Sequence, residues 1–142
     1  MEVYLHTHIP LSDAMGITVA AFDAAGVTLQ AELGPNLNHR DTAFGGSVAA
    51  LAILAGWTHV HLRLRAAGIE THTVIQDSSV RYDAPIFDVF SACCGDISDD
   101  AWARFTRTLS KRGKARIRVR AILESQGERV GHFEGAYVAI RR

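Results

Sequence analysis

The alternation of apolar and polar residues predicts a strand hairpin near the start of the chain. From Val27 to Leu33 every second residue is apolar and the residues between are polar, which is the pattern of a strand with one buried face. Ile17 to Asp23 precedes this strand across the short connection Ala24 to Gly26. We therefore expect the two segments to pair in an antiparallel hairpin.

Four further strands are predicted in the second half of the chain. The clearest begins at Lys114, where Lys and Arg alternate with Ala, Ile and Val as far as Ala121. The turn Gln126-Gly127 then leads into the last strand and completes a second hairpin. The other three segments are Thr73 to Ala84, which Pro85 stops, Val89 to Ile97, and the last strand, Arg129 to Ile140.

A long apolar helix is predicted between the two hairpins. No charged residue occurs from Gly45 to Trp57, and the segment is rich in Ala and Leu, which favour helices. A helix that is apolar on all sides is expected to be buried on all sides. The pattern becomes amphipathic from Thr58 to Arg65, and Gly68 suits the left-handed residue that often follows a helix.

A shorter amphipathic segment begins at Asp99, which is expected to cap it. Its apolar residues fall on one side of a helix; they are Ala101, Trp102, Phe105 and Leu109. We predict one or two helical turns that cover an edge of the sheet. A strand in part of this segment is the alternative.

The order of these elements predicts an α+β fold. A hairpin, a buried helix and four more strands suggest an antiparallel sheet of about six strands that curls around the helix. No linker or repeat interrupts residues 1 to 142, so we expect a single domain. One sheet cannot cover the helix completely, and a second copy would cover its open side and the sheet edges. The expected assembly is a homodimer or a dimer of dimers.

Composition narrows the classes of partner. The 142 residues are 48% hydrophobic, and 15 Lys and Arg balance 15 Asp and Glu. A neutral chain has no overall field to attract a nucleic acid or an anionic membrane, so neither is expected as a partner. The start lacks the pattern of a secretion signal, and the apolar run Ala43 to Trp57 is short for a membrane span. These features favour a cytoplasmic protein.

The cysteines and histidines predict no metal site, and we expect no cofactor. Cys93 and Cys94 are adjacent in a predicted strand, where they would point to opposite faces, so we expect two small buried side chains and no disulfide. The pairs His6-x-His8 and His59-x-His61 lack the spacing of zinc ligands.

Most polar side chains of the first half lie in the loop that precedes the long helix, from Pro35 to Ser47. The first turn of a helix has backbone N–H groups without an internal partner, and Gly45 and Gly46 would let a substrate approach them. The N–H groups of Gly46 and Ser47 could then polarise a carbonyl group and hold negative charge on its oxygen. The alternative is that the two glycines only permit close packing.

This loop and helix resemble those of the hotdog-fold acyl-CoA thioesterases, in which an Asn precedes a Gly-Gly pair that opens the central helix. Within that superfamily, the chain is most similar to a thioesterase domain family that also occurs fused behind acetyltransferase domains. The matching residues are Asn38, Thr42 to Ser47, Ala55 to Trp57, Arg81 to Pro85 and Gly135 to Val138. The resemblance implies a hotdog fold and a thioester substrate, carried by coenzyme A or an acyl carrier protein. It also implies that the strand with Asp77, Ser78 and Tyr82 lies beside the pantetheine channel.

One departure from the resemblance concerns catalysis. The phenylacetyl-CoA type of hotdog thioesterase has His-Gly-Gly and a carboxylate about two turns into the helix, whereas this chain has Phe44 and Ile53 at those places. The attacking water must then be oriented by another group. The candidates are Asn38, which we rank first, Asp41 and Thr42 in the loop, and Asp77 and Ser78 on the facing strand.

Several candidate residues have more than one interpretation. Asp41 could act as a base if burial raised its pKa, or it could cap the helix. Ser47 lacks the partners of a nucleophile, so we expect a helix-stabilising or carbonyl-facing hydroxyl. His39 could transfer a proton or be an exposed loop residue. Substrate contacts are expected from His39, Phe44, Asp77, Ser78, Arg81 and Tyr82. We expect the cations Lys114, Arg116, Arg118 and Arg120 to form a solvated outer face. The alternative is that, with Arg81 and Lys111, they meet the phosphates of coenzyme A.

Three functions fit the sequence. The first is hydrolysis of an acyl thioester by water without a covalent intermediate, with a catalytic set of Asn38, Asp41, Thr42, Gly45, Gly46 and Ser47. The second is a module that binds acyl-CoA without cleaving it. The third is dehydration of a hydroxyacyl thioester, which requires a His and a carboxylate, and only His39 and Asp41 could supply them.

Overall fold

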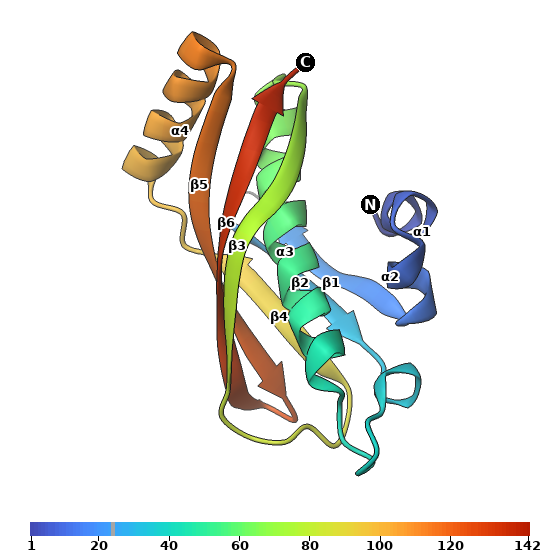
Figure 1. Cartoon of the computed structure of the whole chain (residues 1–142). Helices are drawn as coiled ribbons and strands as arrows, with labels where there is room; N and C mark the ends of the chain where they lie inside the picture. Colours follow the sequence, from blue (N-terminus) through green and yellow to red (C-terminus); the bar gives the residue numbers. More distant parts are fainter. Residues whose placement is uncertain (24) are drawn as a thin grey trace.

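The computed structural model describes residues 1–23 and 25–142 and has a curved antiparallel sheet around one long helix, α3 (Gly45–Ala66) (Figure 1). The sheet has six strands in the order β1-β2-β4-β5-β6-β3. Their bounds are β1 Ile17–Asp23, β2 Gly26–Ala31, β3 Thr71–Tyr82, β4 Phe90–Gly95, β5 Lys114–Ser125 and β6 Glu128–Arg141. This is the hotdog fold, and the predicted α+β class is confirmed. Ala24, in the predicted hairpin connection, lies outside the described residues.

The sequence pattern did not predict the short helices near the N-terminus, and it predicted too short a helix after residue 98. The N-terminus forms α1 (Glu2–His8) and α2 (Pro10–Ala14), and a 3-10 turn, η1 (Gly34–Asn36), follows β2. The segment after residue 98 is α4 (Asp99–Arg112), a helix of 14 residues, so the prediction of one or two turns is wrong. Its cap is Ser98, whose hydroxyl accepts a hydrogen bond from the Ala101 N–H at 3.1 Å, and not Asp99.

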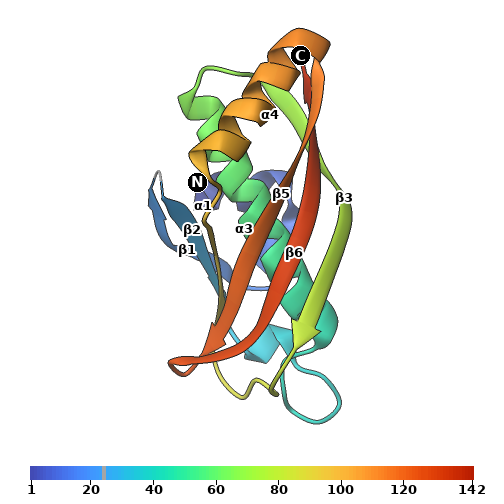
Figure 2. The ribbon, with the colours of Figure 1, turned by 90° about the vertical axis from the view of Figure 1, so that its left-hand side faces the viewer.

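Helix α4 lies where β5 has no strand beside it. β4 pairs only with Arg120–Ser125, so the first half of β5 is an edge on that side. Figures 1 and 2 show α4 beside β5 there, and the buried residues of α4 are Phe105 and Leu109. The guanidinium carbon of Arg63, near the end of α3, lies 4.2 Å from the centre of the Trp102 ring. The prediction that this segment covers a sheet edge is therefore confirmed.

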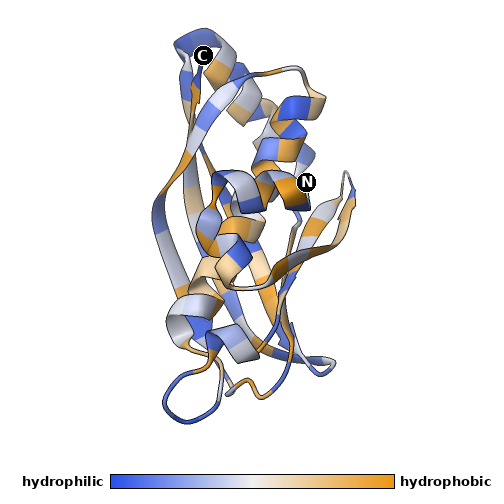
Figure 3. Ribbon diagram, turned by 90° about the vertical axis from the view of Figure 1, so that its right-hand side faces the viewer, coloured by the Kyte–Doolittle hydropathy of each residue, from blue (hydrophilic) through white to orange (hydrophobic). Residues whose placement is uncertain are grey.

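Helix α3 is buried on one side only. Leu51, Ala52 and Ala55 are fully buried against the sheet, whereas Ala50 and Ile53 on the opposite face are half-buried. The expectation of burial on all sides is therefore wrong for the isolated chain. Helices α1 and α2 cover part of this face, and Figure 3 views the molecule from their side. The rest of the face is open.

Tyr137 of β6 holds α3 against the sheet at Gly56. The Tyr137 hydroxyl donates a hydrogen bond to the carbonyl oxygen of Ile53, and the side chain is fully buried. Burial raises the pKa of this phenol, so the hydroxyl keeps its proton. A Cβ atom at Gly56 would lie 2.4 Å from the hydroxyl oxygen, so no larger residue fits without movement.

Strand β3 is a long, exposed edge of the sheet. It pairs with β6 alone, and most of its side chains are exposed. The Trp57 indole N–H donates to the carbonyl oxygen of Thr73 at 2.8 Å, which satisfies one group of this edge. The other edge is β1. Neither observation tests the expected homodimer, which stays a prediction.

The two cysteines differ in environment. Cys94 is fully buried, and burial is the main cause that raises the pKa of its thiol to about 12. Cys93 is exposed, so the expectation of two buried cysteines is wrong for this one.

Helix α3 ends at Ala66, and Gly68 has the left-handed backbone that the sequence predicted, with φ of 72°. With 22 residues the helix is long and apolar enough to span a membrane, but 56% of its most apolar stretch is buried inside the domain. Burial of this kind is typical of the core helix of a folded domain.

We predict that Gly56→Ala destabilises the protein by about 1–3 kcal/mol, because the added methyl group collides with Tyr137. Ala is the better helix former by about 1 kcal/mol, so without the collision the change would stabilise. The sign is measured by urea unfolding. Gly56→Ala combined with Tyr137→Phe should recover part of the loss, and a stabilising Gly56→Ala would contradict the close contact.

Candidate active site at the start of helix α3

Asn38 organises the loop that leads into α3. Its side-chain oxygen accepts hydrogen bonds from the N–H groups of Arg40 at 2.8 Å and Thr42 at 3.1 Å. Its amide nitrogen donates to the Thr42 hydroxyl at 2.7 Å and to the Ala43 carbonyl at 3.4 Å. An amide side chain has two donor hydrogens and two acceptor lone pairs, so its capacity is filled within the loop. This geometry does not support the role of water-orienting group that the sequence ranking gave to Asn38.

Two other residues that the sequence analysis proposed for the site lie at the tip of the loop, away from the helix. His39 and Asp41 are both exposed, and Asp41 has a left-handed backbone with φ of 60°. The N-cap of α3 is Phe44, with no side-chain cap, so Asp41 does not cap the helix. The hydrophilic loop is visible at the lower end of the ribbon in Figure 3.

The first turn of α3 leaves two backbone donors free. The N–H groups of Ser47 and Val48 both donate to the Phe44 carbonyl, at 3.0 and 3.1 Å. Among residues 1–23 and 25–142, the N–H groups of Gly45 and Gly46 have no hydrogen-bond acceptor. The free donors are therefore the N–H groups of Gly45 and Gly46, and the prediction of Gly46 and Ser47 is wrong for Ser47. Two adjacent free amides at a helix start favour binding of a partly negative oxygen.

Aromatic rings flank the two glycines. The Tyr82 hydroxyl, from the end of β3, donates to the Gly45 carbonyl at 2.8 Å, and a Cβ atom at Gly45 would be in ordinary contact with this ring at 3.5 Å. A Cβ atom at Gly46 would lie 2.4 Å from the Phe44 ring. Close packing with Phe44 is thus a second reason for glycine at position 46, as the alternative interpretation of the sequence held.

A pocket of about 360 Å³ adjoins this turn. Gly45 and Val48 line it from the helix, and the segment after β3 supplies the opposite wall. That segment contains Asp83, a carboxylate to which the sequence analysis gave no role. The Asp83 carboxylate lies 3.5 Å from the Arg81 guanidinium. The full lining is Ala43, Gly45, Val48, Tyr82, Asp83, Ala84, Pro85 and Ile86.

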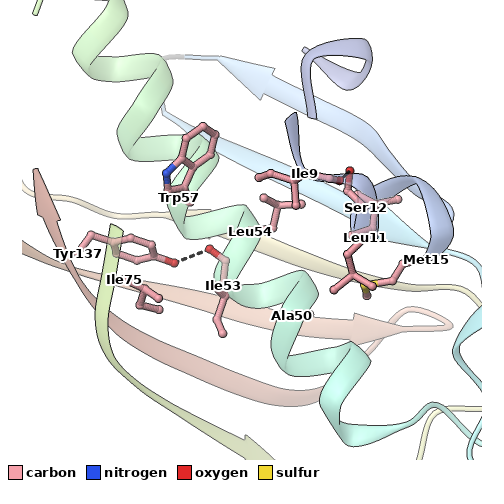
Figure 4. A pocket seen from close by; sticks show the side chains of 11 residues that line it. Ile9, Leu11, Ser12, Met15, Ala50, Ile53, Leu54, Trp57, Ile75 and Tyr137 are labelled. Carbon is pink, nitrogen blue, oxygen red and sulfur yellow. Dashed lines mark hydrogen bonds between the residues drawn. The ribbon is translucent and has the colours of Figure 1, made fainter. Parts of the chain in front are cut away.

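A second, apolar pocket of about 270 Å³ lies further along α3, and Figure 4 shows its side chains. Its wall comes from α3, from Ile75 of β3 and Tyr137 of β6, and from the segment around α2. The pattern of the sequence gave no indication of this pocket, because its wall joins five separate elements. The lining is Ile9, Leu11, Ser12, Met15, Ile17, Ala50, Ile53, Leu54, Trp57, Ile75 and Tyr137.

The register of β3 separates the strand candidates. Ser78 pairs with Gly135 and Asp77 pairs with Ala136, and neighbouring strand residues point to opposite faces. Ser78 and Tyr82 therefore share the face that looks toward α3, whereas Asp77 and Arg81 lie on the outer face. Asp77 is thus not in position to orient water at the helix start within one chain.

The alternating cations of β5 are exposed on that same outer face. The inward residues between them are buried, so Lys114 to Arg120 presents its charges on the side opposite α3. Contact of this stripe with a ligand at the helix start would require the ligand to pass around the sheet edge. Within residues 1–23 and 25–142, no group of three His, Cys, Asp or Glu side chains could hold a metal ion.

The sequence profile of a known family matches residues 1–141, nearly the whole chain. That family is described as putative thioesterase (yiiD_Cterm). The chain belongs to this thioesterase family.

Solved structures agree with this membership. A protein of unknown function from Chlorobaculum tepidum TLS is 27% identical, with a TM-score of 0.94 over 99% of this chain and 92% of that one. A putative thioesterase from Shewanella oneidensis is 26% identical, with a TM-score of 0.83 over 98% of this chain and 93% of that one. A probable thioesterase from Pseudomonas aeruginosa is 17% identical and supports the fold alone, with a TM-score of 0.85 over 99% and 94% of the chains.

We predict that Asn38→Ala loosens the loop. The N–H groups of Arg40 and Thr42 lose their acceptor, so their hydrogen exchange should be roughly fivefold faster or more, one hydrogen bond being worth about 1 kcal/mol. NMR-detected amide exchange measures this. Thr42→Val keeps the Asn38 oxygen and should leave both rates near those of the unaltered protein. Unchanged exchange in Asn38→Ala would return Asn38 to the candidates for the group that orients water.

Proposed function

We propose that this member of the thioesterase family hydrolyses an acyl thioester of coenzyme A or of an acyl carrier protein, with water as the nucleophile. The observation that carries the proposal is the pair of unpartnered N–H groups at Gly45 and Gly46, together with a pocket of about 360 Å³ that Gly45 lines. Water adds to the carbonyl carbon, and the negative charge moves to the carbonyl oxygen between the two N–H groups. The carbon–sulfur bond then breaks, and the leaving thiolate takes up the proton that the attacking water has given to a carboxylate beside the pocket.

Asp83 is the carboxylate best situated to receive a proton from the attacking water. It lines the pocket beside Gly45 and lies 3.5 Å from the Arg81 guanidinium, whereas Asp41 lies at the loop tip and does not line this pocket. Both partners of the pair are largely exposed, so the pair orients the carboxylate more than it stabilises the fold. In this proposal Asp83 replaces Asn38 as the group that orients water, and Ser78 and Tyr82 border the substrate from β3.

The dehydratase hypothesis has less support than hydrolysis. It relied on His39 and Asp41, which are exposed in the loop, and no histidine among the described residues lines the pocket at the helix start. Binding without cleavage remains an outcome of the test described below. The cytoplasm stays the proposed location, on the sequence alone.

We also propose that two copies pair through β3. This strand is a long edge with free backbone groups, and Val74 on it is 55% exposed. The open face of α3 lies beside the same edge, so one interface would cover both.

The expected result of removing one free donor is a large loss of turnover. Pro is tolerated at the first residue of a helix, so Gly45→Pro removes the N–H and keeps the helix start. We predict a kcat/KM lower by about 100-fold to 1000-fold, the usual effect of losing one such donor. Release of coenzyme A from an acyl-CoA panel, captured by a thiol-reactive dye, measures it.

Matched variants separate the roles in this assay. Gly45→Ala keeps the N–H and should lose less than tenfold, because its Cβ makes only ordinary contact with Tyr82. Asp83→Asn should lower kcat, whereas Asp100→Asn, on α4, should have no effect. Equal activity of Gly45→Pro and Gly45→Ala would refute the role of the N–H group. Acyl-CoA binding without any release of coenzyme A would favour the binding module.

The dimer is tested by sedimentation. We predict a mass of twice 15.4 kDa for the unaltered protein. Val74→Lys places like charges close together across a symmetric β3 pair and should shift the equilibrium toward monomer. Val3→Lys, at an exposed position on α1, is the control and should not. A monomer at all concentrations would exclude the pairing.

A further inference from the structure

The positive charge of this chain is concentrated in one short stretch of the sequence. Between residues 104 and 120 there are eight Lys and Arg residues and no Asp or Glu, although the whole chain has 15 residues of each sign. They are Arg104, Arg107, Lys111, Arg112, Lys114, Arg116, Arg118 and Arg120, and all eight side chains are exposed. Four lie on α4 and four on β5, which Figures 1 and 2 show side by side. A chain with no net charge therefore has one strongly basic region.

The four cations of β5 form a row on the outer face of the sheet, opposite α3. Lys114, Arg116, Arg118 and Arg120 alternate with buried residues, so each of them points outward. Alternate residues of a strand are about 6.8 Å apart, so the row is about 20 Å long. Only Arg120 forms an ion pair with a carboxylate of residues 1–23 and 25–142, which is Glu134 at 3.6 Å. The other three cations of the row are therefore available to an anion.

A groove of about 740 Å³ adjoins the Arg118 end of this row. The second half of β5 lines it between the end of β4 on one side and β6 on the other. Three of its lining residues are cations, Arg118, Arg120 and Arg129, and two are carboxylates, Asp96 and Glu134. Glu134 pairs with Arg120, whereas Arg118 and Arg129 form no ion pair within the described part of the chain. The groove therefore continues the row with a further free cation.

The chemistry of the row favours an acidic peptide over a nucleic acid. A guanidinium group binds a carboxylate through two parallel hydrogen bonds, and three of the four cations in the row are Arg. Alternate side chains of an extended peptide are also about 6.8 Å apart, so carboxylates at every second residue could meet the cations in turn. Nucleic acid bases stack on aromatic rings, whereas the β6 residues that pair with the row have none. These residues are Ile140, Val138, Ala136 and Glu134.

We propose that the outer face of β5 and the groove beside it bind an acidic segment of a partner protein in an extended conformation. Carboxylates of the segment pair with Lys114, Arg116 and Arg118 along the row, and a further carboxylate binds Arg129 in the groove. The groove shares no lining residue with the pocket at Gly45. Binding at this face therefore does not depend on hydrolysis at the start of α3.

Binding of labelled peptides, measured by fluorescence anisotropy, tests the match between the row and its ligand. The probe is a peptide of about 12 residues in which Glu and Ser alternate, long enough to span the row when extended. Its control has the same composition with all Glu residues in one block. We predict that the alternating peptide binds about threefold more tightly or better, because all its carboxylates can face the sheet at once. Equal affinity of the two peptides would contradict the match in spacing and overturn the extended binding mode.

Two double variants separate the row from the basic region as a whole. Arg116→Gln with Arg118→Gln removes two cations of the row and should weaken the alternating peptide about fivefold or more. Arg104→Gln with Arg107→Gln is the matched control, because it removes the same charge from exposed positions on α4 that do not line the groove. The control should weaken binding less than about twofold at physiological salt, where exposed charges further away are screened. Equal losses in the two double variants would show long-range attraction alone and overturn the site.

Cys93 reports whether the peptide lies in the groove. It is exposed and lines the groove, whereas Cys94 is buried, so a thiol reagent should modify Cys93 alone. We predict that a saturating amount of the alternating peptide slows this modification about threefold or more. An unchanged rate with the peptide bound would place the peptide elsewhere and overturn the assignment of the groove.

Competition experiments distinguish the acidic segment from other anions. A single-stranded oligoribonucleotide or vesicles of phosphatidylglycerol that displace the peptide at lower concentration than unlabelled peptide would overturn the choice of ligand. A KM for acyl-CoA that rises in Arg116→Gln with Arg118→Gln more than peptide binding weakens would assign the row to the phosphates of coenzyme A. Masses above that of a dimer that disappear in the same double variant would identify a second copy of this chain as the occupant.

Discussion

The burial of one long apolar helix against a curved sheet is the constraint on which the rest of this structure depends. Leu51, Ala52 and Ala55 have no exposed surface, and their burial removes the apolar area that would otherwise face water. The helix can approach the sheet closely because Gly56 leaves space for the Tyr137 ring and hydroxyl. This contact fixes the position of α3, and therefore of its first turn, relative to β3 and β6.

A fixed helix start has functional value only if its backbone donors are left free. The loop before α3 achieves this with its own hydrogen bonds. The Asn38 side chain forms hydrogen bonds with other residues of the loop. The Phe44 carbonyl accepts hydrogen bonds from Ser47 and Val48, and no side chain among the described residues accepts one from the N–H groups of Gly45 and Gly46. A Ser or Asp cap would have bonded one of those donors. Its absence among the described residues costs some helix stability and leaves an electropositive site for a carbonyl oxygen.

The same helix divides the molecule into regions of different polarity. Its first turn meets a pocket with a carboxylate, and its middle turns meet a pocket in which every polar side-chain atom is already hydrogen-bonded. The cations of β5 are on the far face of the sheet. Gly45 and Val48 line the first pocket and Ala50, Ile53 and Trp57 line the second, so the two pockets lie on different sides of the helix.

Local pattern was enough to determine the strands, helix α3 and the fold class, but not the smaller helices. Alternation set the strands, and an uncharged run of good helix formers set α3, because both periods depend only on neighbouring residues. The Asn and Gly-Gly residues of the loop also located the candidate site, since the free donors of a first helical turn are a property of any helix start.

The tertiary structure alone decided which atoms make up that site. The Ser47 N–H donates to the Phe44 carbonyl, and the Asn38 amide forms its hydrogen bonds within the loop. The free donors of the site are therefore those of Gly45 and Gly46, which residue types alone do not reveal. Asp83 comes beside Gly45 through β3, and His61 of α3 meets Tyr4 of α1, across separations that no local period records. Sequence periodicity reports which face of an element is apolar; which elements then meet depends on packing of the whole chain, and the pockets exist only in that packing.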